Sequence, residues 1–121
     1  MTSSEFIKAV LEARLKFAGL DIKLNDQSIF LIHTLSNGNP GYSLAILGSV
    51  LYHTSRCKFD EANCIIPKGY VIDAEDVLNV YPSSDYVNDS KLEEMWNNQK
   101  MSDGTNRVDT KQYWLRCAGY V

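Results

Sequence analysis

Apolar residues recur at helical spacing along the first twenty positions. A polar cap at Thr2 or Ser3 precedes them and Gly19 follows them, in the places where an N-cap and a C-terminal glycine commonly bound a helix. The pattern predicts a first helix whose buried side consists of Ile7, Val10, Leu11, Leu15 and Ala18.

Two more helices are predicted to meet at a tight turn. Asn25 is a good cap for a second helix, which buries Ile29, Ile32 and Leu35. A helix stop and a new start then follow within a few residues, because glycine favours a helix end while asparagine and proline favour the next beginning. The predicted turn residues are Asn37, Gly38, Asn39, Pro40 and Gly41.

The third helix is predicted from Pro40 to about Ser55 and is apolar on most of its circumference. It should therefore be the central, most buried element of the fold. Gly48 lies inside it and costs about 1 kcal/mol of helix stability relative to alanine. We expect a neighbouring backbone to pack closely at this glycine.

The second half of the chain contains shorter elements. Residues 64–66 precede Pro67 and are expected to be extended, with a short β pairing near 64–72. Three short helices follow, at 74–80 after a cap at Asp73, from 89 or 90 to 100, and at 110–117. We therefore predict one mainly α domain over 1–121, a small helical bundle with a helical unit at 3–80 and a C-terminal helical extension at 83–121.

Composition and charge narrow the function classes. The 121 residues are 45% hydrophobic and 22% charged, which is typical of a globular domain. A net charge of -3 argues against a nucleic-acid-binding surface, since phosphates attract clustered basic residues. The first residues lack the features of a signal peptide, and the longest nearly apolar stretch, at 44–52, is too short to span a bilayer. The chain has three cysteines, and an odd number argues against a framework of disulfides. We expect a cytoplasmic protein with reduced thiols and no membrane insertion.

Three stretches of residues 4–80 resemble the helical lid subdomain of AAA+ ATPases, especially the ExeA-like secretion and transposition group. Phe6-Ile7 with Arg14-Leu15 and Ala18-Gly19 is similar to the first lid helix. The segment 26–40 resembles the second helix and the turn before the sensor-2 helix, and Ile72 to Val77 resembles the closing short helix.

This resemblance implies an AAA+ lid-like fold without the nucleotide chemistry of the family. The residue after the turn proline is often the sensor-2 arginine in such lids, whereas Gly41 occupies that position here. None of the seven glycines is followed by lysine, so the chain has no Walker A motif. The resemblance thus implies a lid-like module without its motor, acting in trans or reused as an adaptor.

The reactive side chains do not form a convincing catalytic or metal site. Ser43 lies in a Gly-x-Ser-x-Ala pattern, but a nucleophile elbow needs a preceding strand and this serine is predicted in the first turn of a helix. A zinc site could be formed by His53, Cys57, Cys64 and Cys117, but zinc-binding cysteines usually occur in more closely spaced pairs. We therefore interpret these residues as free side chains. The acidic clusters at 73–76 and 93–94 are interpreted as helix-end and solvated charges. We predict no catalytic residue, no metal and no cofactor.

Aromatic residues are dense in the last 41 positions. Tyrosine and tryptophan are favoured anchors in protein interfaces, although some of these side chains are expected in the core, Trp96 among them. The predicted partner-binding residues are Tyr81, Tyr86, Trp114 and Tyr120.

The sequence therefore predicts a non-enzymatic protein-protein interaction module. As an adaptor or subunit it would serve a cytoplasmic ATPase-containing machine, such as a secretion or DNA-transaction complex, and its partner would be an AAA+ ATPase or another subunit. Two alternatives stay open, a helix-turn-helix nucleic-acid-binding protein and a small phage- or plasmid-type inhibitor of a host protein. Charge counts against the first, because residues 40–55 contain no lysine or arginine. The pattern favours no oligomeric state.

Overall fold

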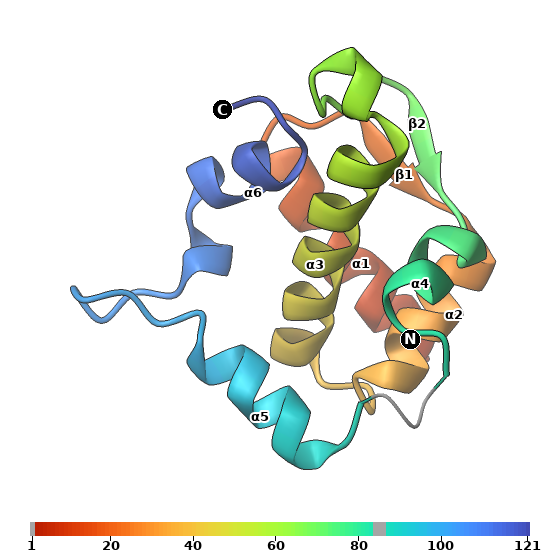
Figure 1. Ribbon diagram of the computed structural model, residues 1–121. Coiled ribbons are helices and arrows are strands. Elements are labelled where there is room, and N and C mark those ends of the chain that lie inside the picture. The colour runs from red at the N-terminus through yellow and green to blue at the C-terminus, as the bar shows by residue number, and fades with distance from the viewer. Residues whose placement is uncertain (1, 84–86) are drawn as a thin grey trace.

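The computed structural model describes residues 2–83 and 87–121, and its architecture is a small helical bundle with one short parallel sheet (Figure 1). The mainly α fold class is confirmed. In chain order the elements are α1 (Ser3–Phe17), β1 (Ile22–Leu24), α2 (Asp26–Leu35), α3 (Pro40–Lys58), η1 (Asp60–Ala62), β2 (Tyr70–Ile72), α4 (Ala74–Val80), α5 (Asp89–Asn97), η3 (Arg107–Asp109) and α6 (Lys111–Cys117).

The predicted turn between α2 and α3 is present in the structure. Asn37 and Gly38 adopt positive φ angles of 55° and 71°, which glycine and asparagine tolerate best. The Asn39 side chain accepts a hydrogen bond from the backbone amide of Tyr42 at 3.0 Å, and Pro40 begins α3. A helix stop and a capped start therefore follow one another directly, as the sequence predicts.

The short sheet pairs two segments that are far apart in the sequence. β1 and β2 run parallel, with Ile22 opposite Tyr70 and Leu24 opposite Ile72. The expected pairing near 64–72 is thus present at residues 70–72, and its partner strand is β1, which lies between α1 and α2. Ile66 instead donates its backbone amide to the carbonyl of Ala118 at 3.0 Å, so the 64–66 segment is held by the C-terminal residues.

Helix α3 is the central element, and it packs against α1, α2, α4, α5 and α6 (Figure 1). It continues to Lys58, three residues beyond the predicted end, and it buries a nearly continuous run from Ser43 to Gly48. The buried cluster around it includes Ile7 and Leu11 from α1 together with Leu92 and Trp114 from the last third of the chain. The 3–80 unit and the 83–121 extension therefore share one hydrophobic core.

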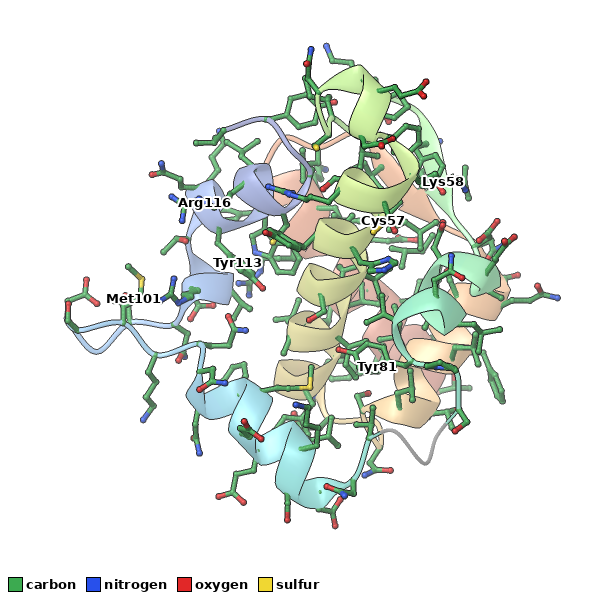
Figure 2. The ribbon with its side chains drawn as sticks, in the orientation of Figure 1. Cys57, Lys58, Tyr81, Met101, Tyr113 and Arg116 are labelled. Atoms are coloured by element: carbon green, nitrogen blue, oxygen red, sulfur yellow. The ribbon has the colours of Figure 1, made fainter. Side chains whose placement is uncertain are left out.

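Gly48 is a contact point between α3 and α6, and the close neighbour is a side chain rather than the expected backbone. Tyr113 points from α6 toward α3 (Figure 2). A Cβ atom added to Gly48 would lie 2.2 Å from the Tyr113 hydroxyl oxygen and 3.0 Å from Cζ of the same ring. The glycine in this helix is therefore explained by the position of the tyrosine ring.

The substitution Gly48→Ala is expected to destabilise the protein despite the better helix propensity of alanine. Alanine gains about 1 kcal/mol in propensity, but overpacking a filled core costs about 1–3 kcal/mol, so we expect a net loss of up to about 2 kcal/mol. Urea unfolding followed by circular dichroism measures the change in the free energy of unfolding.

The Tyr113→Phe background is the matched control for this substitution. Phenylalanine lacks the hydroxyl that makes the shortest contact, so Gly48→Ala should cost clearly less there than in the native background. An equal cost in both backgrounds would show that the Tyr113 hydroxyl does not determine the need for glycine.

Candidate functional site

The predicted aromatic anchors do not form one exposed surface. Trp114 is fully buried and donates its indole Nε1 hydrogen to the carbonyl of Val108 at 2.7 Å. Tyr81 is only 8% exposed, whereas Tyr120 is 39% exposed and donates its hydroxyl to the carbonyl of Ile66 at 2.6 Å. Tyr86 lies outside the described residues. Trp114 and Tyr81 thus belong to the core, and we do not include them in a binding surface.

Gly41, the last residue of the predicted turn, lies under a tryptophan ring. A Cβ atom added there would lie 3.1 Å from the outer ring carbons of Trp96, which α5 positions and which is itself half-buried. The C-terminal extension therefore covers the position next to the turn. A long side chain at this position would require α5 to move.

The candidate reactive side chains are spread over the molecule. Ser43 is buried and donates its hydroxyl to the carbonyl of Pro40 at 2.7 Å, inside the first turn of α3, so the nucleophile-elbow geometry is not formed. Sγ of Cys57 lies 3.5 Å from Nε2 of His53, which precedes it by one helical turn. Cys117 is buried, and burial raises the pKa of its thiol to about 11. In the part of the chain that the structure describes, no three His, Cys, Asp or Glu side chains gather as a metal site would require.

One polar cluster links three elements and was not predicted. Asp76 of α4 is buried. Its carboxylate accepts one hydrogen bond from the Tyr70 hydroxyl at 2.6 Å and another at 3.2 Å from the backbone amide of Asp73, the residue that caps α4. Lys58, at the end of α3, places Nζ 2.7 Å from the Tyr70 hydroxyl and 3.5 Å from the carboxylate.

This cluster is best explained as a structural connection between α3, β2 and α4. Burial and the hydrogen bond to Asp76 raise the pKa of Tyr70 to about 12, and the hydrogen bond to Tyr70 raises the pKa of Lys58. Near neutral pH the phenol is therefore protonated and the amine is charged, so neither group serves as a base. The sequence signal was present in the Asp73-x-x-Asp76 capping box, but spacing alone does not bring Tyr70 and Lys58 to it.

A different feature, an apolar groove between α2 and α4, has the properties of a binding surface. Phe30 and Leu31 line it from α2, and Ala74 and Leu78 line it from α4, giving a groove of about 440 Å³ that Asp26 and Gln27 complete. Phe30 is 63% exposed and Leu78 is 41% exposed. Large apolar side chains that meet at the surface in this way are typical of interaction sites.

The sheet explains why these two helices form a groove. β1 and β2 run side by side in the same direction, and each leads directly into a capped helix, α2 after Asn25 and α4 after Asp73. Both helices therefore begin at the same end of the groove. Asp26 in the lining gives that end a carboxylate.

Comparisons with family models, with curated proteins and with solved structures each find no match to this chain. Over residues 2–83 and 87–121, no helix combines the length and the hydropathy needed to cross a bilayer.

Proposed function

We propose that this protein is a non-enzymatic interaction module that binds a protein partner through the groove between α2 and α4. The observation that carries the proposal is the exposure of Phe30 and Leu78 in one apolar groove. Such side chains become hot spots when a partner removes them from water.

The charge beside the groove indicates what kind of segment fits it. Asp26 lies at the end where both helices begin, so it favours a partner whose apolar anchors are flanked by lysine or arginine. An amphipathic helix with two apolar anchors and a basic end has this chemistry, and helix-in-groove binding is a common mode of peptide recognition.

The position of α3 favours protein binding over the helix-turn-helix alternative. A recognition helix must present side chains to base edges in the major groove. Here the second helix of the pair is the central element, with Leu44, Ile46 and Leu47 buried, and it carries no basic residue before Arg56. The helix pair is therefore suited to forming a core.

The resemblance of residues 4–80 to AAA+ lids supports a more specific role as an adaptor or subunit of a cytoplasmic ATPase-containing machine. Lid-like helices without a Walker A motif or a sensor-2 arginine provide a docking shape and no nucleotide chemistry. The groove contains Phe30 and Ala74, which lie in two of the stretches that carry this resemblance.

Differential capture tests this proposal. The native chain, a Phe30→Glu/Leu78→Glu variant and a Tyr52→Glu control serve as baits for a lysate of the native host. The control changes an exposed aromatic residue on α3 that does not line the groove. A protein held by the native and control baits but lost from the groove variant is then purified and titrated against all three by calorimetry.

The expected result is an affinity at least about 30-fold weaker for the groove variant, since hot-spot changes cost about 2 kcal/mol or more. A captured AAA+ ATPase would support the adaptor role, and a captured host enzyme whose activity falls would support the inhibitor alternative. Identical protein sets on all three baits would overturn the assignment of the groove.

A further inference from the structure

Helix α1 carries a second apolar face in addition to the face that it buries. Ile7, Leu11 and Leu15 lie in the core, but another set of apolar residues faces outward at spacings of four, three and four. This stripe consists of the exposed Phe6, Ala13 and Phe17 and of Val10, which is half-buried and also packs against the core. At 100° per residue it occupies an arc of only about 60°, which is the width of a helix-pairing seam. Phe6 is 46% exposed and Phe17 is 55% exposed.

The order of residues in the stripe is symmetric about its centre. Phenylalanine stands at both ends, and the smaller Val10 and Ala13 stand in the middle. When two such helices cross antiparallel about a two-fold axis, Phe6 of one copy faces Phe17 of the other, and Val10 faces Ala13. Small central residues let the helices approach closely, and an isologous pairing of this kind is self-complementary.

The surface beside the stripe provides space for the end of a second helix. A hollow of about 460 Å³ is lined by Val10, Ala13, Phe17, Arg14 and Asp109. Arg14 bridges to Asp109 at 2.8 Å, which fixes η3 at the edge of the hollow. In the antiparallel register the Phe6 ring of the second copy lies opposite Phe17 and enters this hollow.

Charge beside the stripe selects the same register. Glu5 and Lys16 are both exposed, and their eleven-residue separation places them within about 20° of each other on one flank of the stripe. In the antiparallel pair, Lys16 of one copy lies within about two residues, roughly 3 Å along the axis, of Glu5 of the other. Two symmetric ion pairs form, whereas in a parallel pair this flank of the two copies would lie on opposite sides of the seam and Glu5 could not meet Lys16.

We propose that this chain forms a homodimer through α1, which pairs antiparallel with the α1 of a second copy. The seam is short, so the interface falls in the small, transient class and the dissociation constant should be roughly 10–100 µM. The α2–α4 groove lies outside this seam, and the two surfaces can be tested separately.

Sedimentation equilibrium of the full chain over a range of concentrations tests the proposal. The native protein should show a monomer-dimer equilibrium, and Ala13→Glu should weaken it at least tenfold. Lys16→Glu should weaken it less, by repulsion from Glu5. Lys8→Glu, which changes an exposed lysine away from the stripe, and Phe30→Glu in the α2–α4 groove should leave it unchanged.

A mixing experiment tests the antiparallel register. Glu5→Lys and Lys16→Glu each place like charges across the seam when alone, but a mixture of the two forms heterodimers with two ion pairs, one in the native sense and one reversed. The mixture should therefore contain more dimer than either variant at the same total concentration. Glu5 also closes the capping box at Thr2, so thermal melts must show that both variants are folded.

Three results would each overturn the proposal. A native chain that stays monomeric throughout shows that the stripe does not pair with itself. A dimer unaffected by Ala13→Glu uses another face. A mixture with no gain over the separate variants rules out the antiparallel ion pairs.

Discussion

Replacing Trp114 by alanine is expected to lower the free energy of unfolding by about 4 kcal/mol. The side chain is fully buried, its ring meets Tyr113 edge to face with centroids 5.2 Å apart, and its Nε1 hydrogen is donated to the Val108 carbonyl. Truncating a buried tryptophan costs about 3–5 kcal/mol, which is a large share of the 5–15 kcal/mol that stabilises a typical domain. Urea unfolding followed by far-ultraviolet circular dichroism measures the loss.

Trp96→Ala is the matched control for this prediction. It removes the same chemical group from a half-buried position on α5, and we expect a loss of about 1–2 kcal/mol. If both variants lose the same amount, α6 is not part of the core that stabilises the fold. A transition in two steps for Trp114→Ala would also contradict the single shared core, because then the first 80 residues would unfold separately.

The sequence predicted the elements of this fold well wherever the signal was local. The caps at Thr2, Asn25, Asn39 and Asp73 all accept the expected backbone hydrogen bonds, because the cap and the amide that it accepts from are only three residues apart. The central burial of α3 followed from an apolar pattern that covers most of its circumference.

Contacts between distant segments were beyond the reach of the same reasoning. The sheet pairs residues 22–24 with residues 70–72, and three-residue strands are too short to show an alternating pattern. Trp114 and Tyr81 have the residue type of interface anchors, but the residue type does not distinguish a buried tryptophan from an exposed one. Gly48 indicated a close neighbour correctly, while the identity of Tyr113 depends on how α6 folds back onto α3.

The candidate binding groove was missed for the same reason. Phe30 lies on the polar side of α2 and Leu78 on a short helix 48 residues later, and neither stands out alone. They meet only because parallel pairing of β1 and β2 starts both helices at one edge. The sequence assigned Val10 to the buried side of α1, whereas in the structure it is only half-buried, beside the exposed Phe6, Ala13 and Phe17.

The second large effect is expected for Asp76→Ala, which should lower the free energy of unfolding by about 2–4 kcal/mol. The substitution removes the acceptor for the Tyr70 hydroxyl, the return bond of the capping box to the Asp73 amide, and the partner of Lys58. Hydrogen bonds to a buried charged group contribute about 1.5–3 kcal/mol, while the half-exposed Lys58 adds little. Chemical denaturation measures the loss, and Glu75→Ala, which removes an exposed carboxylate from the same helical turn, should cost less than about 0.5 kcal/mol.

The pH dependence gives this prediction a second, independent readout. In the native protein the pKa of Tyr70 is raised from 10.0 to about 12, first by burial and then by the hydrogen bond to Asp76. A phenol with a raised pKa stabilises the fold fully below pH 10, and that contribution is lost as the pH rises from 10 to about 12, because the unfolded chain releases the proton first. Asp76→Ala removes one of the two causes, so the variant should lose less stability over this interval than the native protein does. Tyr70→Phe should lose still less, since it removes the titrating group. If all three chains lose stability equally between pH 10 and 12, the hydrogen bond from Tyr70 to Asp76 does not contribute to the stability of the fold.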